Sequence, residues 1–214
     1  QEKITQYHIK AYKKIINKNK NLKLDLIGFP GQTILHKPSE GYTIQIGDYK
    51  LLAQETKKIV IYNFRNNDIF NGGEGAPLTP LYHRAILKKT KYKFPLAIIN
   101  IGGISNITYA ETKDKILSFD IGPGNILINK WVSSKSKLKF DDKGLLADSG
   151  NVKIDILKSF LDNPYFYKKF SKSLDIKDFT LTNLDKLNLE DGCATLSMLT
   201  VKSICMTIKN LKKL

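Results

Sequence analysis

The sequence has very little cysteine and no long apolar run. Its two cysteines, Cys193 and Cys205, lie in one expected helix and suit neither a disulfide framework nor a zinc site. The longest apolar runs, such as Leu96 to Ile99, are far shorter than the roughly 18 to 20 residues that a membrane span needs. The N-terminal residues also lack the apolar core of a secretory signal. The sequence therefore predicts a cytoplasmic protein in a reducing compartment, with no membrane partner and no assigned metal ligands.

Arginine is scarce although the net charge is strongly positive. The chain has 35 basic and 20 acidic residues, a formal net charge of +15, and its only arginines are Arg65 and Arg84. Arginine is the preferred residue for bidentate contacts with phosphate and guanine, whereas these lysines are spread among many Asn and Ile residues. We expect no specific nucleic-acid partner. A basic polyanion-binding protein, whose binding would weaken steeply with salt, is the less favoured alternative.

With 214 residues and 42% hydrophobic content, the chain is long and apolar enough for one large or two small domains. A boundary is expected near residue 94, after the lysine-rich stretch KKTKYK, and gives domains 1–94 and 95–214. In the first domain the patterns predict helices at 2–20, 49–56 and 80–88 and strands at 24–28, 43–47 and 58–64.

The second domain has three predicted strands followed by helices. The strands are 95–101, 105–111 and 115–120, the helices are 125–133, 152–160 and 194–211, and an irregular link covers 172–180. This order indicates an α/β fold. The small number of strands after residue 120 indicates an incomplete second sheet.

Two glycine loops in the first domain follow predicted strands. In the first, Gly31 allows close approach of a ligand to the backbone, and Gln32 and Thr33 offer neutral hydrogen-bond groups. In the second, Asp68 is expected at a strand end, before the run Gly72-Gly73-Glu74-Gly75. Taken singly, the first loop is more simply explained as a turn, and Asp68 as a helix cap or loop residue.

Two further glycine loops lie in the second domain. The hairpin 100–106 contains Gly102, Gly103, Ser105 and Asn106, and successive backbone N–H groups at its tip would cradle an anion. The loop 120–125 puts Asp120 at the end of a strand and Gly122 and Gly124 before a helix, where a phosphate or a hydroxyl-rich ligand would fit. A plain hairpin explains the first loop equally well. Four such loops in one short chain suggest a shared cleft.

The order of these motifs resembles the anhydro-N-acetylmuramic acid kinase family of bacterial cell-wall recycling. The matching stretches are DLIGFPGQT, QIGD, FRNNDIFNGGEGAPLTPLYH, NIGGISNIT, FDIGPGN, DKGLLADSG, NPYF and KSLD. The resemblance implies the actin, Hsp70 and sugar-kinase architecture, in which two ribonuclease-H-like α/β lobes close over ATP and sugar.

The resemblance also implies a reaction and site residues. ATP, with Mg²⁺, would phosphorylate 1,6-anhydro-N-acetylmuramic acid while water opens its anhydro ring, giving N-acetylmuramic acid 6-phosphate. Asp68 matches the general base that draws a proton from this water. The implied sugar contacts are Gly31, Gln32, Thr33, Gly72, Gly73, Glu74 and Asp120, with Asp120 alternatively meeting a Mg²⁺-bound water. The implied ATP contacts are Gly102, Gly103, Ser105, Asn106, Gly122 and Gly124.

The chain departs from the family pattern at several points. Pro30 stands where the family usually has histidine, and Glu74 where it usually has glutamine. The family's first ATP-phosphate loop and its last glycine-rich nucleotide loop have no counterpart, so both lobes are expected to be incomplete and the chain inactive alone. A complementing fragment or a homodimer would restore the missing parts. The alternative is a non-catalytic remnant that still binds sugar.

The histidines receive structural interpretations. We expect His8 and His36 at the surface. We expect His83 to be a helix cap or a residue that contacts the site residues without taking part in catalysis. Both cysteines are expected to be small apolar residues without chemistry.

Overall fold

The computed structural model describes residues 1–168, 174 and 176–211 of the chain. The fold is mixed α/β and divides into two compact units, Gln1–Leu78 and Thr79–Leu214. The lobes predicted from the sequence divide instead near residue 94, and their assignment remains a prediction.

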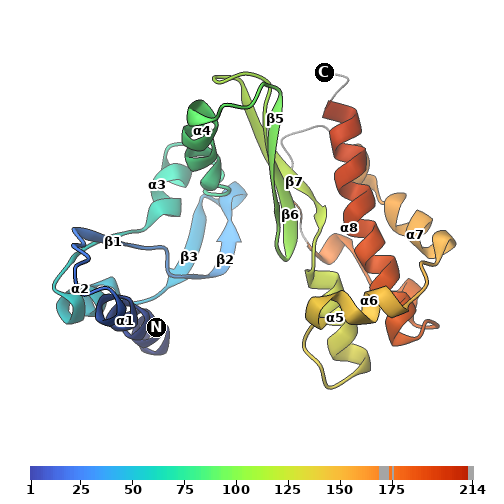
Figure 1. Cartoon of the computed structure of the whole chain (residues 1–214), viewed down its shortest axis with the longest axis horizontal. Helices are drawn as coiled ribbons and strands as arrows, with labels where there is room; N and C mark the ends of the chain where they lie inside the picture. Colours follow the sequence, from blue (N-terminus) through green and yellow to red (C-terminus); the bar gives the residue numbers. More distant parts are fainter. Residues whose placement is uncertain (169–173, 175, 212–214) are drawn as a thin grey trace. The chain divides into compact units, whose positions relative to one another are not determined.

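The first unit contains three helices and two small sheets in its described residues (Figure 1). The elements are α1 (Glu2–Lys18), β1 (Leu26–Phe29), β2 (Gln32–Lys37), the 3-10 turn η1 (Pro38–Glu40), β3 (Tyr42–Ile46), α2 (Tyr49–Thr56), β4 (Ile59–Tyr62) and α3 (Phe64–Phe70). Strand β1 pairs in parallel with β4, and β2 pairs antiparallel with β3.

A small buried cluster holds the first unit together. Ile9, Phe29 and Leu52 bring α1, β1 and α2 into contact. The Asp48 carboxylate caps α2 by accepting a hydrogen bond from Leu51 N–H at 2.9 Å, which satisfies one of the unpaired donors of the first turn. The Asp48 N–H donates to the buried hydroxyl of Thr5 in α1 at 2.8 Å, so the cap also ties α1 to α2.

The two-stranded parallel sheet of this unit exposes apolar side chains. Leu26 is 53% exposed and Ile59 67% exposed. Parallel sheets are normally covered on both faces. The exposure is of the kind expected where a sheet lacks neighbours, although the incompleteness itself remains a prediction.

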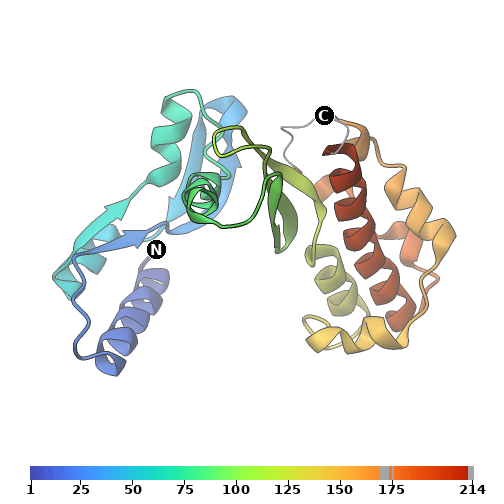
Figure 2. The same ribbon diagram turned by 45° about the horizontal axis from the view of Figure 1, so that its top comes forward.

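The second unit joins a three-stranded sheet to a helical layer (Figures 1 and 2). Its helices are α4 (Thr79–Lys89), α5 (Ile126–Lys135), α6 (Leu145–Ser149), α7 (Ile154–Leu161) and α8 (Leu189–Leu211). Its strands β5 (Leu96–Ile101), β6 (Ile104–Ala110) and β7 (Ile116–Pro123) form an antiparallel meander. Short 3-10 turns lie at Asp142–Gly144, Pro164–Tyr167, Ile176–Asp178 and Thr182–Leu184.

The long helix α8 is the centre of this unit. It packs against β7, α5, α6 and α7 (Figure 2). Trp131 of α5 is 1% exposed, and its indole N–H donates to the carbonyl of Leu189 at 2.9 Å. A Cβ at Gly192 would overlap the Trp131 ring. The close approach of α5 to α8 therefore requires glycine at this position.

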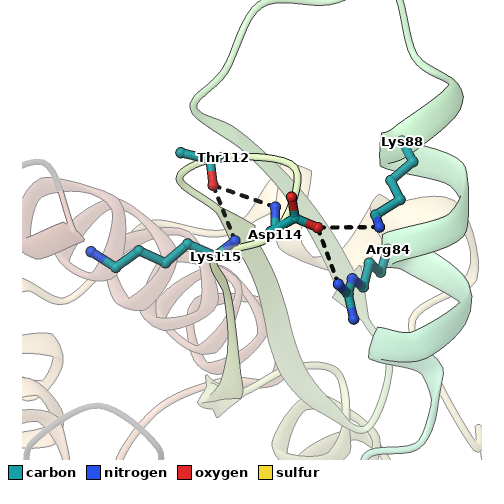
Figure 3. Close-up of polar contacts among 5 residues, drawn as sticks. All are labelled: Arg84, Lys88, Thr112, Asp114 and Lys115. Atoms are coloured by element: carbon teal, nitrogen blue, oxygen red, sulfur yellow. Dashed lines mark hydrogen bonds and ion pairs between the residues drawn. The ribbon is translucent and has the colours of Figure 1, made fainter.

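Helix α4 is joined to the turn between β6 and β7. Figure 3 shows Asp114 Oδ1 between two cations of α4, at 3.1 Å from Arg84 Nη2 and 3.2 Å from Lys88 Nζ. The hydroxyl of Thr112 accepts hydrogen bonds from the N–H groups of Asp114 and Lys115 and so shapes the turn. The two cations lower the pKa of Asp114. This exposed cluster orients α4 on the sheet and contributes little stability.

Several predicted boundaries were wrong. Asp68, expected at a strand end, lies in α3, because Asn63 adopts a left-handed φ of 62° that turns the chain from β4 directly into a helix. Asp120, expected to end its strand, lies inside β7. This strand continues to Pro123 because a bulge at Ile121, opposite Ser105 and Asn106 of β6, lets the pairing resume at Gly122.

Other differences are smaller. The 32–37 segment was not predicted as a strand, and the last helix begins at Leu189 instead of residue 194. Of the predicted irregular link, residues 172, 173 and 175 lie outside the described residues. No helix among the described residues combines the length and apolar content needed to cross a membrane.

Candidate functional site

Asp68 is held by the glycine loop that follows its helix. The N–H of Gly75 donates to Asp68 Oδ2 at 2.7 Å, and the N–H of Gly73 donates to the Asp68 carbonyl at 2.8 Å. A Cβ at Gly73 would overlap the Asp68 carboxylate, and one at Gly75 would lie 2.8 Å from Ile69 Cδ1. The half-buried carboxylate therefore has a fixed orientation, with Oδ1 free of any hydrogen bond within the described residues.

Arg65 supports the same loop. It lies one turn before Asp68 on α3, and its Nη1 donates to the Gly75 carbonyl at 3.4 Å. Gly75 has a φ of +65°. Gly75 is thus held through its N–H by Asp68 and through its carbonyl by Arg65. Gly72 has a φ of +84° and open space around it, so its backbone conformation alone explains glycine there.

His36 of β2 faces this loop, contrary to the prediction that it is a simple surface residue. Burial and the Arg65 guanidinium lower the pKa of His36, while a hydrogen-bond interaction with the Glu74 backbone and the Glu74 carboxylate partly oppose this effect. Glu74, which was predicted to contact the sugar, is exposed. The histidine thus connects the β2–β3 hairpin with the loop that positions Asp68.

A chain of hydrogen bonds runs from His36 to Thr33. His36 Nδ1 lies 3.0 Å from Thr43 Oγ1, and the Thr43 hydroxyl donates to the Leu35 carbonyl at 3.2 Å. Since that hydroxyl has one proton, His36 Nδ1 is the donor in their contact. Gln45 Nε2 then donates to Thr43 Oγ1 at 2.6 Å and to Thr33 Oγ1 at 3.3 Å.

The sequence analysis did not identify His36, Thr43 or Gln45 of this chain as site residues. Thr43 and Gln45 alternate along β3 and so share one face. That alternation within TIQIG is the signal from which they could have been found. Gln32 is exposed and donates to the Thr33 carbonyl at 3.3 Å. Gly31 has a φ of +65°, and a Cβ there would lie 2.9 Å from the Ile46 carbonyl oxygen, so the hairpin itself requires this glycine.

In the second unit, the predicted phosphate hairpin contacts the start of α5. The N–H groups of Gly124 and Ile126 donate to the Gly103 carbonyl at 2.9 and 3.2 Å, and the N–H of Asn125 donates to the Gly102 carbonyl at 2.8 Å. These donors of the helix start are therefore already used. The N–H groups of residues 124 to 126 are therefore not available to an anion.

The glycines of this region fall into two kinds. A Cβ at Gly124 would overlap the Gly102 carbonyl, so packing requires this glycine, and one at Gly122 would lie 3.1 Å from Phe166 and 3.2 Å from Ser203, a tight fit. By contrast, a Cβ at Gly102 or Gly103 would make only ordinary contacts at 3.7 Å, and neither has a left-handed φ. Local structure does not require glycine at these two tip positions, which leaves room for a ligand to approach the backbone.

A row of polar residues crosses the sheet next to the hairpin. Asn100, Asn106 and Asp120 are directly opposite one another on β5, β6 and β7, so they share one face. Asp120 Oδ2 accepts a hydrogen bond from Leu174 N–H at 2.9 Å. Burial raises the pKa of Asp120, and this hydrogen bond partly opposes the rise.

Ser105 is 1% exposed, and its hydroxyl has no hydrogen-bond partner among the described residues. A Cβ at Gly124 would lie 2.9 Å from this hydroxyl oxygen, which places the oxygen against the start of α5. It is an unsatisfied polar group directly beneath the hairpin tip.

The fit to ATP and Mg²⁺ rests on these features. The uncovered tip at Gly102 and Gly103 and the unsatisfied Ser105 hydroxyl suit a phosphate group. No group of three or more His, Cys, Asp or Glu side chains that could hold a metal occurs among the described residues. A Mg²⁺ ion carried on ATP needs no such cage, since it keeps several waters and binds phosphate oxygens with one or two carboxylates. Asp120, which lies opposite Asn106 on the neighbouring strand, is the carboxylate of this polar row.

His83, Cys193 and His8 have structural roles. His83 Nδ1 lies 2.8 Å from Thr108 Oγ1 and helps to fix α4 on β6. Burial raises the pKa of the Cys193 thiol to about 11, so this thiol is inert near neutral pH. His8 contacts the Phe29 ring edge-on at 4.9 Å between centroids.

The chain was compared with known proteins. The sequence profile of the family described as anhydro-N-acetylmuramic acid kinase matches residues 1–213. The protein of that name from Pelagibacter ubique is 44% identical over 199 residues, which are 92% of this chain and 53% of the relative. The one from Zymomonas mobilis is 41% identical over 208 residues, 96% of this chain and 56% of the relative.

A third similar protein, from Methylobacterium nodulans, has the same name and is 38% identical over 210 residues, covering 97% of this chain and 56% of the relative. The chain thus spans about half the length of these curated relatives. The match to the family profile runs through all four glycine loops, which confirms the resemblance found in the sequence. The chain belongs to the anhydro-N-acetylmuramic acid kinase family.

Proposed function

We propose that this chain provides part of an ATP-dependent kinase that phosphorylates 1,6-anhydro-N-acetylmuramic acid and opens its anhydro ring with water. The product is N-acetylmuramic acid 6-phosphate. The single observation that best supports the proposal is the Asp68 carboxylate, oriented by Gly75 N–H and packed against Gly73. A reaction that consumes ATP and an amino sugar fits the cytoplasm, where we expect the protein to act.

Asp68 acts as the general base in this proposal. Its Oδ2 is occupied by Gly75 N–H, so Oδ1 accepts the proton of the attacking water. The water oxygen bonds to the anomeric carbon as the bond from that carbon to O6 breaks. The released O6 takes the γ-phosphoryl group of ATP, and ADP leaves. A positioned carboxylate contributes about 10²–10⁴-fold to such a step.

The hairpin tip and its surroundings hold the nucleotide phosphates. Gly102 and Gly103 let phosphate oxygens approach the backbone, and Ser105 and Asn106 supply polar side chains close by. When bound, Mg²⁺ neutralises charge on the phosphates. Asp120 accepts a hydrogen bond either from a Mg²⁺-bound water or from a sugar hydroxyl, and its raised pKa favours neither.

Thr33, Gln32, Gly31 and the Gly72–Glu74 loop bind the sugar in this proposal. The support is the hydrogen-bond chain from Thr33 through Gln45 and Thr43 to His36 beside Glu74. This chain joins the two predicted sugar-binding loops of the first unit.

A kinase assay on the 214-residue chain tests the proposal. The chain is incubated with ATP and the anhydro sugar, alone and together with polypeptide segments that supply the remaining length of the relatives. We expect no turnover from the chain alone, because the charge of the triphosphate must be met by phosphate loops from both lobes. We expect formation of ADP and phosphorylated sugar when the segments are present.

The remaining outcomes distinguish the alternatives. Turnover by the chain alone would contradict its dependence on further segments. Sugar binding without turnover in the supplemented mixture would favour the non-catalytic remnant. DNA binding that survives 200 mM salt would favour the polyanion-binding alternative, since nonspecific binding weakens steeply with salt.

A further inference from the structure

One peptide group, which joins Glu74 to Gly75, lies between Asp68 and His36. Its N–H belongs to Gly75 and donates to Asp68 Oδ2 at 2.7 Å. Its carbonyl belongs to Glu74. Burial and the Arg65 guanidinium lower the pKa of His36, whereas a hydrogen-bond interaction with the Glu74 backbone raises it. A backbone group that favours the protonated ring is an acceptor, so the partner of His36 is this carbonyl.

The second ring nitrogen fixes how His36 meets the peptide group. Strand β3, which pairs with the strand of His36, packs against α3 (Figure 1). His36 Nδ1 lies 3.0 Å from the hydroxyl oxygen of buried Thr43. That hydroxyl gives its proton to the Leu35 carbonyl, so Nδ1 is the donor in this contact. Nε2 is the nitrogen left for the Glu74 carbonyl.

The protonation state of His36 decides whether this carbonyl receives a hydrogen bond. In the neutral ring Nδ1 carries the single proton, and the lone pair of Nε2 cannot bond to a carbonyl. In the protonated ring Nε2 also carries a proton and donates to the Glu74 carbonyl. Hydrogen bonds in series polarise and strengthen one another by about 10–30% per bond. A proton on His36 therefore strengthens the hydrogen bond from Gly75 N–H to Asp68.

Two charged side chains shift the pH at which the ring gains its proton. The Arg65 guanidinium, on α3, adds to the effect of burial, and the Glu74 carboxylate, in the glycine loop, opposes both. The net effect lowers the pKa of His36 from 6.5. Its partner on β3, Thr43, carries no charge. The ring is therefore mostly neutral at pH 7.5 and gains its proton in mild acid.

We propose that His36 is a positioning residue that regulates Asp68 through the peptide group joining Glu74 to Gly75. The neutral ring leaves Asp68 as the stronger proton acceptor. The protonated ring tightens the hydrogen bond on Oδ2, and a carboxylate whose charge is better stabilised is a weaker base. The inference rests on the proposed function, in which Asp68 is the general base, and it adds a residue that controls this base.

The first test needs no turnover. In the ¹⁵N- and ¹³C-labelled 214-residue chain, the ring signals of His36 and the amide signal of Gly75 are followed by NMR between pH 5 and 8. Carboxyl groups ordinarily titrate near pH 4, below this range. We expect the Gly75 amide to show an inflection at the same pH as the His36 ring. His36→Gln should remove this inflection, and His8→Gln, at an exposed histidine of α1, should leave it unchanged.

Two further variants change the groups at the ends of the path. Glu74→Gln removes a negative charge and should move the inflections of His36 and Gly75 together to lower pH. Asp68→Asn should also lower the pH midpoint of His36, because a coupling between two groups acts equally in both directions. The Asn amide oxygen can still accept from Gly75 N–H, so this variant keeps the loop.

The second test measures turnover in the presence of the polypeptide segments that supply the remaining length of the relatives. For the unmodified chain, kcat should fall about threefold between pH 7.5 and the pH at which the His36 ring is protonated. The KM for ATP should stay the same. His36→Gln should remove this fall. A merely structural role of His36 would lower kcat at every pH and leave the shape of the profile unchanged.

The outcomes separate this inference from the proposed kinase reaction. The inference is overturned if the Gly75 amide has no inflection at the pH of the His36 ring, or if Glu74→Gln moves only one of the two signals. An active mixture whose kcat profile is unaffected by His36→Gln also overturns it. If the two signals titrate together but the mixture has no turnover, the link between His36 and the Asp68 loop is supported and the kinase proposal fails.

Discussion

Gly75 N–H donates to Asp68 Oδ2 at 2.7 Å, and the intervening Gly73 has no room for a Cβ beside the same carboxylate. The glycine loop and the acid therefore form one structural unit. A structural helix cap would be the simplest role for such an acid, but Asp68 lies near the end of α3 instead of its start. A carboxylate at the C-terminal end of a helix interacts unfavourably with the helix dipole and lowers the stability of the helix. This position favours a functional reason for Asp68.

Asp68→Asn separates the chemical role from the structural one. The amide oxygen can still accept from Gly75 N–H, so we expect the loop to persist and the free energy of unfolding to change by less than about 1 kcal/mol. Turnover should fall by about 10²-fold or more, because an amide is no base near neutral pH. Turnover and ATP affinity are measured in the presence of the polypeptide segments that supply the remaining length of the relatives.

The matched control for Asp68→Asn is Asn67→Ser, at the exposed neighbouring position of α3. We expect it to retain activity and ATP affinity. An Asp68→Asn variant with turnover close to that of the unmodified protein would disprove the assignment of the base.

Glycine substitutions distinguish ligand-facing from structural glycines in the second unit. Gly124→Ala should lower the free energy of unfolding by about 1–3 kcal/mol, because its Cβ overlaps the Gly102 carbonyl. Gly102→Ala should change it by less than about 0.5 kcal/mol, since the new Cβ meets only ordinary contacts. Urea unfolding measures both values.

The same pair of variants tests nucleotide binding. Gly102→Ala should weaken ATP binding by the supplemented protein at least tenfold, although it leaves the fold intact. Normal ATP affinity in this variant would show that the hairpin tip does not approach phosphate.

The sequence predicted the positions of most helices and strands because their apolar periodicity is clear. The three-stranded meander of the second unit, for example, follows directly from the alternation in residues 95–120. The sequence did not reveal where strands end. The β-bulge at Ile121 lets β7 continue past Asp120, and a bulge depends on pairing between strands that a single segment does not encode.

The candidate site was predicted in part. The glycine loops stood out by composition, yet composition could not tell which glycines serve packing. Gly31 and Gly124 are required by the carbonyls of Ile46 and Gly102, which come from other segments. His36 was missed for a related reason, since its link to Glu74 exists only when β2 lies beside the glycine loop.

Asp191 makes the free energy of unfolding of the second unit depend on pH in the acid range. Its carboxylate accepts from Asn151 N–H at 2.7 Å and pairs with Lys153 Nζ at 2.7 Å. The Lys153 ammonium, and then the Asn151 hydrogen bond, lower the pKa of Asp191. A lowered pKa in the folded state contributes stability above the unfolded pKa of about 4, which is lost as pH falls through the folded pKa.

We therefore expect Asp191→Asn to flatten the acid side of the stability profile. The free energy of unfolding, measured by urea titration between pH 2 and 6, should differ between the two proteins above pH 4 and converge below it. Asp155→Asn is the control, because Asp155 is an exposed acid of α7 that forms no ion pair within the described residues. A constant difference across this range would show that the Asp191 charge has no role.

His36 should make the first unit less stable in mild acid. Burial and Arg65 lower its folded pKa below the unfolded value of about 6.5. The folded state then binds fewer protons than the unfolded state, so the free energy of unfolding rises with pH through the window below 6.5. Glu74 opposes this effect through its backbone and its carboxylate, so Glu74→Gln should enlarge the pH dependence by removing the negative charge.

The measurement compares unfolding of the unmodified chain, His36→Gln and Glu74→Gln at pH 5.5 and 7.5. Glutamine at position 36 can still donate to Thr43 but does not titrate, so the difference between the two pH values should shrink. His8→Gln is the matched control, because His8 is exposed on α1 and its Nδ1 lies 2.9 Å from the Ile4 carbonyl of its own helix. If His8→Gln reduces the pH dependence as much as His36→Gln, the effect does not arise from the hydrogen-bond chain that reaches the Asp68 loop.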